Sequence, residues 1–173
     1  TPASFDGSIS LQVSGSASID VVGLLTVDGS FVLTQFEIAA ADVAKFGAGA
    51  SGLALVLQVS GGVPSGAVSG SGTLELVRIS NLAGQTWLAA EATDLEFSLE
   101  FGPLTMAVTN GSLILNQAPV GSAPLDWTTV TVPTSTNVVL TPTAFDGSIS
   151  LQVSGSASID VVGLLTVEGS FVL

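Results

Sequence analysis

The sequence predicts an all-β protein, and three observations support this fold class. Apolar and polar residues alternate with a period of two along most of the 173 residues, which is the pattern of half-exposed strands. Dipeptides that favour tight turns recur between the alternating runs. A long internal repeat indicates an array of similar units. We therefore expect an elongated β-solenoid-like or two-layer β-sandwich repeat with one short helix, stacking in an array.

The internal repeat defines the domain organisation. Residues 1–33 return almost unchanged as residues 141–173, so the period is 140 residues. The two copies differ at three positions, which are Ala3/Thr143, Ser4/Ala144 and Asp28/Glu168. We predict that residues 1–140 form one full repeat and that residues 141–173 begin the next one. Residues 119–142 are rich in Pro, Ser and Thr and are expected to form the junction.

Alternation predicts a series of short strands along the chain. In order, their apolar positions are Ile9, Leu11 and Val13; Ala17, Ile19 and Val21; Leu25 and Val27; Phe31 and Leu33; Phe36 and Ile38; Leu53, Leu55, Leu57 and Val59; Leu74 and Leu76; Leu95, Phe97, Leu99 and Phe101; Leu104, Met106 and Val108; and Leu113 and Leu115. Many strands are expected to begin at Gly-Ser, with hairpin turns at Asp28-Gly29 and Asn110-Gly111. The runs around Val21-Val22 and Leu24-Leu25 are apolar on both faces, which favours two packed layers.

One segment departs from the strand pattern. Residues 37–46, with the sequence EIAAADVAKF, are rich in Ala and are followed by Gly47. Glycine just after a helical run is a common end signal, because it tolerates a positive φ. The segment is predicted to form a helix of two or three turns.

The composition excludes most enzyme classes. The chain has no His, Cys or Tyr, and its basic residues are Lys45 and Arg78. Catalysis near neutral pH mostly depends on groups that this chain lacks, so we expect no enzyme. A net charge of -12 argues against nucleic acid as a partner, since phosphate binding needs clustered basic residues. The apolar runs are too short for a spanning helix, so we expect a protein that is not embedded in a membrane.

Acidic side chains supply the candidate cation ligands. Six of them recur in the two copies of the repeat: Asp6, Asp20, Asp28, Asp146, Asp160 and Glu168. Carboxylate oxygens are the ligands that calcium prefers, so a structural calcium ion is the one candidate cofactor. The alternative is that these acids are solvated turn residues, because Asp before Gly is also typical of hairpin turns.

The contact between consecutive copies is expected to be apolar. The candidate interface residues are Ile9, Leu11 and Val13 of the first copy and Ile149, Leu151 and Val153 of the second. Each triplet alternates with serine or glutamine, so it would present one apolar strand face to a neighbouring copy.

The repeat resembles the long tandem repeats of giant bacterial surface and secreted proteins. The resemblance rests on the run GSISLQVSGSASIDVVGLLTVDGSFVL, the AAADVAKF segment and the strands SGLALVLQVS and GTLELVRISNLAGQTWLAAEATDLEFSLEF. It implies extracellular or cell-surface material that is adhesive or forms filaments. It brings no catalytic residues to this chain.

We therefore expect a non-enzymatic structural repeat of an extracellular β-rich filament or stalk, whose partner is another copy of the same protein. Two ways of joining copies stay open. Residues 141–173 either begin the covalently following repeat or donate strands to a neighbouring subunit. The alternative function is a spacer or binding repeat of a bacterial adhesin.

Overall fold

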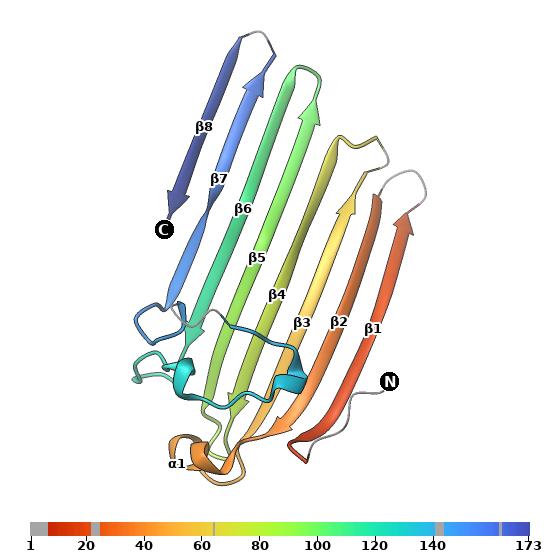
Figure 1. Ribbon diagram of the computed structural model, residues 1–173. Helices are drawn as coiled ribbons and strands as arrows, with labels where there is room; N and C mark the ends of the chain where they lie inside the picture. Colours follow the sequence, from red (N-terminus) through yellow and green to blue (C-terminus); the bar gives the residue numbers. More distant parts are fainter. Residues whose placement is uncertain (1–6, 22–24, 64, 141–143, 163) are drawn as a thin grey trace.

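The computed structural model describes residues 7–21, 25–63, 65–140, 144–162 and 164–173. These residues form one open antiparallel sheet whose eight strands follow each other in chain order (Figure 1). The strands are β1 (Ile9–Val21), β2 (Leu25–Glu37), β3 (Ser51–Gly62), β4 (Val68–Ser80), β5 (Thr86–Phe101), β6 (Leu104–Gln117), β7 (Leu151–Val161) and β8 (Leu165–Val172). The predicted all-β class with a short helix is confirmed.

The second copy of the repeated sequence continues the sheet of the first. Strand β7 repeats the sequence of β1, and β8 repeats that of β2. Strand β7 pairs with β6 on one side and with β8 on the other. Val153 pairs with Leu113 of β6, and Ala157 pairs with Val108. In contrast, β1 is the edge strand of the sheet that the described residues form, and among them it pairs with β2 alone.

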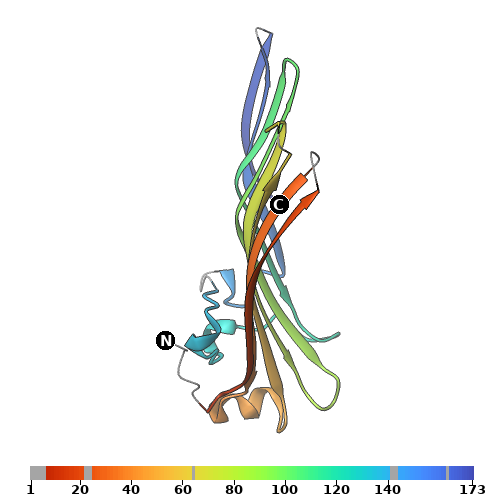
Figure 2. The ribbon, with the colours of Figure 1, turned by 90° about the vertical axis from the view of Figure 1, so that its right-hand side faces the viewer.

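A long connection between β6 and β7 covers part of one face of the sheet. The described parts of this crossing segment are residues 118–140, which leave β6 and pass over the lower half of the sheet, and residues 144–150, which lead into β7 (Figures 1 and 2). It contains two short 3-10 helices, η2 (Trp127–Thr129) and η3 (Thr134–Thr136). The buried core lies between the crossing segment and β2 to β5, and consists of Phe36, Phe46, Ala54, Val77, Ile79, Ala89, Trp127, Ala144 and Phe145.

The predicted helix is shorter than expected. Strand β2 continues to Glu37, which pairs with Ser51, so the first part of the predicted helix is extended. Helical structure comprises η1 (Ala40–Asp42) and α1 (Val43–Phe46). Gly47 ends α1 with a φ of 89°, and its backbone N–H donates to the carbonyl of Val43, as the end signal predicted.

The hairpin turns predicted at Asp28-Gly29 and Asn110-Gly111 are wrong. Both dipeptides lie inside long strands, and strands of 12 to 16 residues replace several of the shorter predicted ones. At Asn110, with a φ of 51°, the positive φ forms part of a β-bulge, where the β6–β7 register shifts.

The glycines inside the strands make room for neighbouring side chains. A Cβ atom placed on Gly72 would lie 2.6 Å from Cδ2 of Leu95. A Cβ atom placed on Gly111 would lie 2.9 Å from Cβ of Leu95. Leu95 therefore lies against two glycines of the flanking strands. Glycine in these strands marks close approach of a neighbour, whereas the sequence pattern suggested strand starts and turns.

Proline substitutions at two equivalent serines test the pairing of β7 with β6. The backbone N–H of Val153 donates to the carbonyl of Leu173, and the N–H of Leu173 donates to the carbonyl of Val153. The N–H of Val153 therefore faces β8. Amides alternate along an antiparallel strand, which places the Ser158 N–H toward β6. By the shared register of the two copies, the Ser18 N–H faces the open edge of β1.

We expect Ser158→Pro to lower the free energy of unfolding by about 2 kcal/mol more than Ser18→Pro, because it removes a donor from a paired strand and leaves an acceptor on β6 unsatisfied. Urea unfolding followed by tryptophan fluorescence measures both values. The local sequence is the same around the two serines, so each variant controls for the other. An equal decrease in the free energy of unfolding for the two variants would show that β7 is not hydrogen-bonded to β6 in solution.

Candidate functional site

The two faces of the sheet differ in chemistry, because residues opposite each other on neighbouring antiparallel strands share a face. We call one of them the polar face. Beyond the area that the crossing segment covers, this face carries rows of hydroxyl, amide and carboxylate side chains. One row is Ser16, Ser30, Gln58, Thr73 and Thr93, and the next is Ser18, Asp28, Ser60, Ser71 and Glu96.

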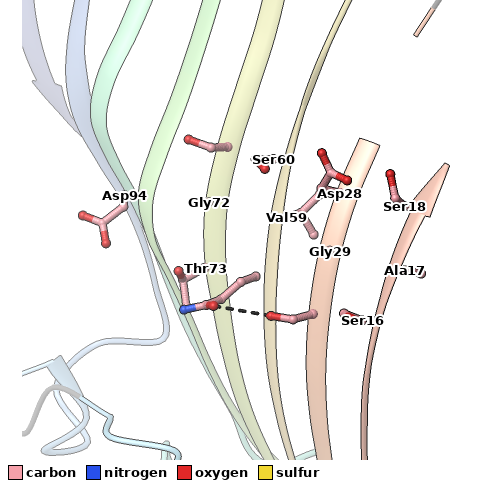
Figure 3. A pocket seen from close by; sticks show the side chains of 13 residues that line it. Ser16, Ala17, Ser18, Asp28, Gly29, Val59, Ser60, Gly72, Thr73 and Asp94 are labelled. Carbon is pink, nitrogen blue, oxygen red and sulfur yellow. Dashed lines mark hydrogen bonds between the residues drawn. The ribbon is translucent and has the colours of Figure 1, made fainter. Parts of the chain in front are cut away.

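A shallow groove of about 530 Å³ lies along the polar face between β1 and β5 (Figure 3). It is lined by side chains of both rows and by Asp94, which has a φ of 52° at a β-bulge in β5. The Ser30 hydroxyl donates to Oε1 of Gln58 across the groove at 3.4 Å. The groove offers hydrogen-bonding groups, and its lining within the described ranges contains no aromatic side chain.

The opposite face, which we call the apolar face, is built from aliphatic and aromatic side chains. One row is Val13, Leu33, Leu55, Leu76, Ala90, Leu115 and Leu151, and the next is Gly15, Phe31, Leu57, Leu74, Ala92, Leu113 and Val153. Both rows continue from β1 to β7. The crossing segment lies on the other side of the sheet, as the edge-on view shows (Figure 2).

The charged residues of the sheet are divided unequally between the faces. Asp20, Glu75, Glu91, Glu100, Asp160 and Glu168 share the polar face with Asp28 and Glu96. On the apolar face, Arg78 and Glu37 lie in the two rows nearest to α1. Most of the negative charge of the described sheet is therefore on one side, and the centre of the apolar face is uncharged.

Buried hydrogen bonds attach the crossing segment to the sheet. Trp127 is buried, and its indole N–H donates to Oδ1 of Asn116 on β6 at 3.0 Å. The amide of the same asparagine donates to the carbonyl of Leu125 at 2.9 Å. At the other side of the sheet, Gln12 of β1 donates to the carbonyl of Ser135 at 2.8 Å. These bonds link the crossing segment to strands at both sides of its own repeat.

A buried carboxylate makes a further attachment. Asp42, at the end of η1, accepts a hydrogen bond from the backbone N–H of Thr131 at 2.9 Å and pairs with Lys45 at 3.0 Å. Lys45 also donates to the carbonyl of Thr129. Burial by itself raises the pKa of Asp42, but the hydrogen bonds from Thr131 and Lys45 outweigh it, so the pKa lies below its ordinary value of 3.8.

The candidate calcium ligands are spread over the sheet. Asp20 lies opposite Thr26 and Asp28 lies opposite Ser18 on the β1–β2 pair. In the second copy, Asp160 accepts a hydrogen bond from the Thr166 hydroxyl at 2.8 Å, and Glu168 lies opposite Ser158. Asp6 lies outside the described residues.

Asp146 is hydrogen-bonded within a local turn. Its carboxylate accepts hydrogen bonds from the hydroxyl and the backbone N–H of Ser148 at 2.6 and 2.9 Å, which lower its pKa. Within the part of the chain that the structure describes, no three acidic side chains come together as metal ligands. The structure therefore does not bring the described candidates into one site.

The candidate interface residues mostly lie on the apolar face. Leu11 and Val13 are exposed on β1, while Leu151 and Val153 pair with Leu115 and Leu113 of β6. Ile9 is half-buried at the start of β1 and is followed by a register shift, and Ile149 is half-buried just before β7.

Sequence reasoning missed the division of the sheet into an acidic face and a largely apolar face. The signal was present, because the acids of residues 94–100 alternate with Leu and Phe. The same alternation holds for Ser and Asp against Ile and Val in residues 16–21. Assigning both runs to one face required the strand register, which the sequence alone does not supply.

Comparison with protein-family models, with curated proteins and with solved structures found no match to this chain. Among the described residues, no helix has the length and apolar character needed to cross a membrane.

The pKa of Asp42 predicts a pH-dependent attachment of the crossing segment. Because the pKa of Asp42 is lower in the folded state, its ionised carboxylate stabilises the fold at pH values above 3.8. This stabilisation is lost as the pH falls through the folded-state pKa. We expect Asp42→Asn to lower the free energy of unfolding at neutral pH by about 1–3 kcal/mol. The difference from the unsubstituted chain should shrink below pH 3.8, as urea unfolding at several pH values would show.

The exposed Asp20 provides the control for this experiment. Asp20→Asn removes the same charge and should change the stability by less than about 0.5 kcal/mol. A difference for Asp42→Asn that stays constant down to pH 2 would contradict the assigned role of its carboxylate.

The positions of the acidic residues also predict the response to divalent cations. Because the described carboxylates are dispersed, a chelator is expected to leave the midpoint of thermal unfolding unchanged. Scanning calorimetry with and without chelator measures this. A midpoint that rises by several degrees with added calcium would show that a cation site exists and would support the calcium hypothesis.

Proposed function

We propose that this chain is a structural repeat unit of an extracellular β-rich filament or stalk, in which one sheet continues through consecutive repeats. The observation that carries the proposal is the position of β7. This strand has the sequence of β1, and it pairs with β6 of the preceding repeat. By the same register, β6 of an earlier repeat would pair with the open edge of β1.

The geometry of such an array follows from strand spacing. One repeat contributes six strands, β1 to β6, before the sequence begins again at β7. Neighbouring strands lie about 4.8 Å apart, so each repeat would advance the sheet by about 29 Å. We propose an elongated array of this kind as the arrangement in which the repeats stack, with the crossing segment of each repeat covering its own strands.

The pairing within this chain favours covalent continuation over strand donation. The β7–β8 hairpin packs on β6 of its own chain, and the connection to it is anchored through Trp127 and Gln12. In strand donation, the β7–β8 hairpin would instead pair with another subunit, and β6 of its own chain would pair with a hairpin from a different subunit. Extracellular localisation is part of the proposal and is supported by the strongly acidic composition with two basic residues, which suits a soluble, protease-resistant material.

A spacer or binding repeat of an adhesin is the second candidate, and the groove on the polar face favours it. Its hydroxyl and carboxylate groups are suited to hydrogen bonding with a carbohydrate. Carbohydrate sites usually add an open aromatic ring, however, and the two tryptophans do not provide one there. Trp127 is buried, and Trp87 is half-buried with its ring 5.0 Å from that of Phe46. The structural function is therefore preferred.

Electron microscopy and fibre diffraction of native material test the filament proposal. We expect fibres with an axial repeat of about 29 Å and a reflection near 4.8 Å along the fibre axis, since the strands would run across it. Isolated globular particles, or fibres in which the 4.8 Å reflection is perpendicular to the axis, would contradict it.

A further inference from the structure

The apolar face is larger than a monomeric soluble protein usually exposes. It spans eight strands and roughly ten residues along each strand. At about 4.8 Å per strand and 3.4 Å per residue, this amounts to about 1,300 Å². A stable interface typically buries about 800 Å² on each partner, so the face is large enough to form one. Exposed apolar patches beyond a few hundred Å² usually mark interaction sites.

The distribution of charge selects which face can meet a second copy of this chain. Two polar faces would bring rows of Asp and Glu together, and like charges would oppose their contact. Two apolar faces would meet without such repulsion, because Arg78 and Glu37 lie near one end and the central rows carry no charge. A pair formed in this way has an apolar interior and two acidic outer surfaces.

The shape of the apolar face also favours contact with a second copy. A hollow of about 320 Å³ lies over Gly70 and Gly72, between Leu57 and Leu95. Close to it, the Phe97 side chain is 44% exposed and pairs across the strands with Gly70. In a symmetric pair, each copy supplies the same patch, so a projecting ring of one copy can enter the hollow of the other.

We propose that the apolar face packs against the apolar face of a second copy of this chain, forming a two-layer β-sandwich between chains. Sheets pack face to face about 10 Å apart, with the side chains of the two inner faces interdigitating. The proposal is independent of the end-to-end continuity described above, because it uses the face of the sheet and not its edge. It would supply the second layer that the two-sided apolar runs predict.

The oligomeric state of the 173-residue chain tests the proposal. Sedimentation velocity over a wide concentration range is expected to show a dimer of the 17.2 kDa chain. Phe97→Asp places a charge in the interface and should weaken dimerisation by about a hundredfold or more. Ser98→Asp, on the neighbouring residue and on the polar face, should leave the dimer intact. A dimer that survives Phe97→Asp would overturn the proposal, because it would have to form elsewhere.

Cysteine reactivity gives a second measurement that does not place a charge on the face. The chain has no cysteine, so single cysteines can be placed on adjacent residues of β3 that point to opposite faces. We expect Val59→Cys to be protected from a maleimide and to become reactive on dilution, while Ser60→Cys reacts at the same rate throughout. Equal reactivity of the two variants at high concentration would contradict the proposal.

A membrane surface is the competing occupant of the apolar face. Neutral phosphatidylcholine vesicles provide the probe, and the expected result is no co-sedimentation of the dimer with them. A chain that stays monomeric at all concentrations and binds these vesicles through Phe97 would assign the face to lipid and overturn the proposed pairing.

Discussion

Backbone pairing between β6 and β7 is the interaction on which the proposed architecture depends. An antiparallel sheet satisfies its backbone groups through its neighbours, and every sheet that ends leaves an unpaired edge. In this chain the edge that β6 would otherwise present is occupied by β7, the first strand of the second copy. The sheet of β1 to β6 is thus extended by β7 and β8, and the β6–β7 pair uses the same antiparallel hydrogen bonding that joins the other strands.

The crossing segment makes this continuity compatible with a covalent chain. The chain has to travel from the end of β6 to the start of β7 at the same end of the sheet, where a short hairpin would have been enough. It instead uses about thirty residues, buries Trp127 and Phe145 against β2 to β5, and bonds to strands at both sides of the repeat. This segment gives the lower half of the sheet a local core, whereas the remainder of the sheet is a single layer with one acidic and one apolar face.

The sequence predicted some of these features well because they depend on local chemistry. Period-two alternation identified the strands, and Gly47 identified the end of the helix. Asp28-Gly29 and Asn110-Gly111 do not indicate hairpin turns uniquely, because tight turns, β-bulges and close side-chain contacts all favour such dipeptides. The choice among them depends on neighbours such as Leu95, which are distant in sequence. The faces of the sheet, and with them the grouping of the acidic side chains, likewise depend on register between strands.

Amide hydrogen exchange tests the continuous sheet most directly. In the 173-residue chain, we expect protected amides at Ser156 and Ser158, which face β6, and fast exchange at the equivalent Ser16 and Ser18 of the open edge. In a longer chain that carries another repeat before residue 1, Ser16 and Ser18 should become protected as well. Fast exchange at all four serines, or no gain of protection in the longer chain, would contradict a sheet that runs from one repeat into the next.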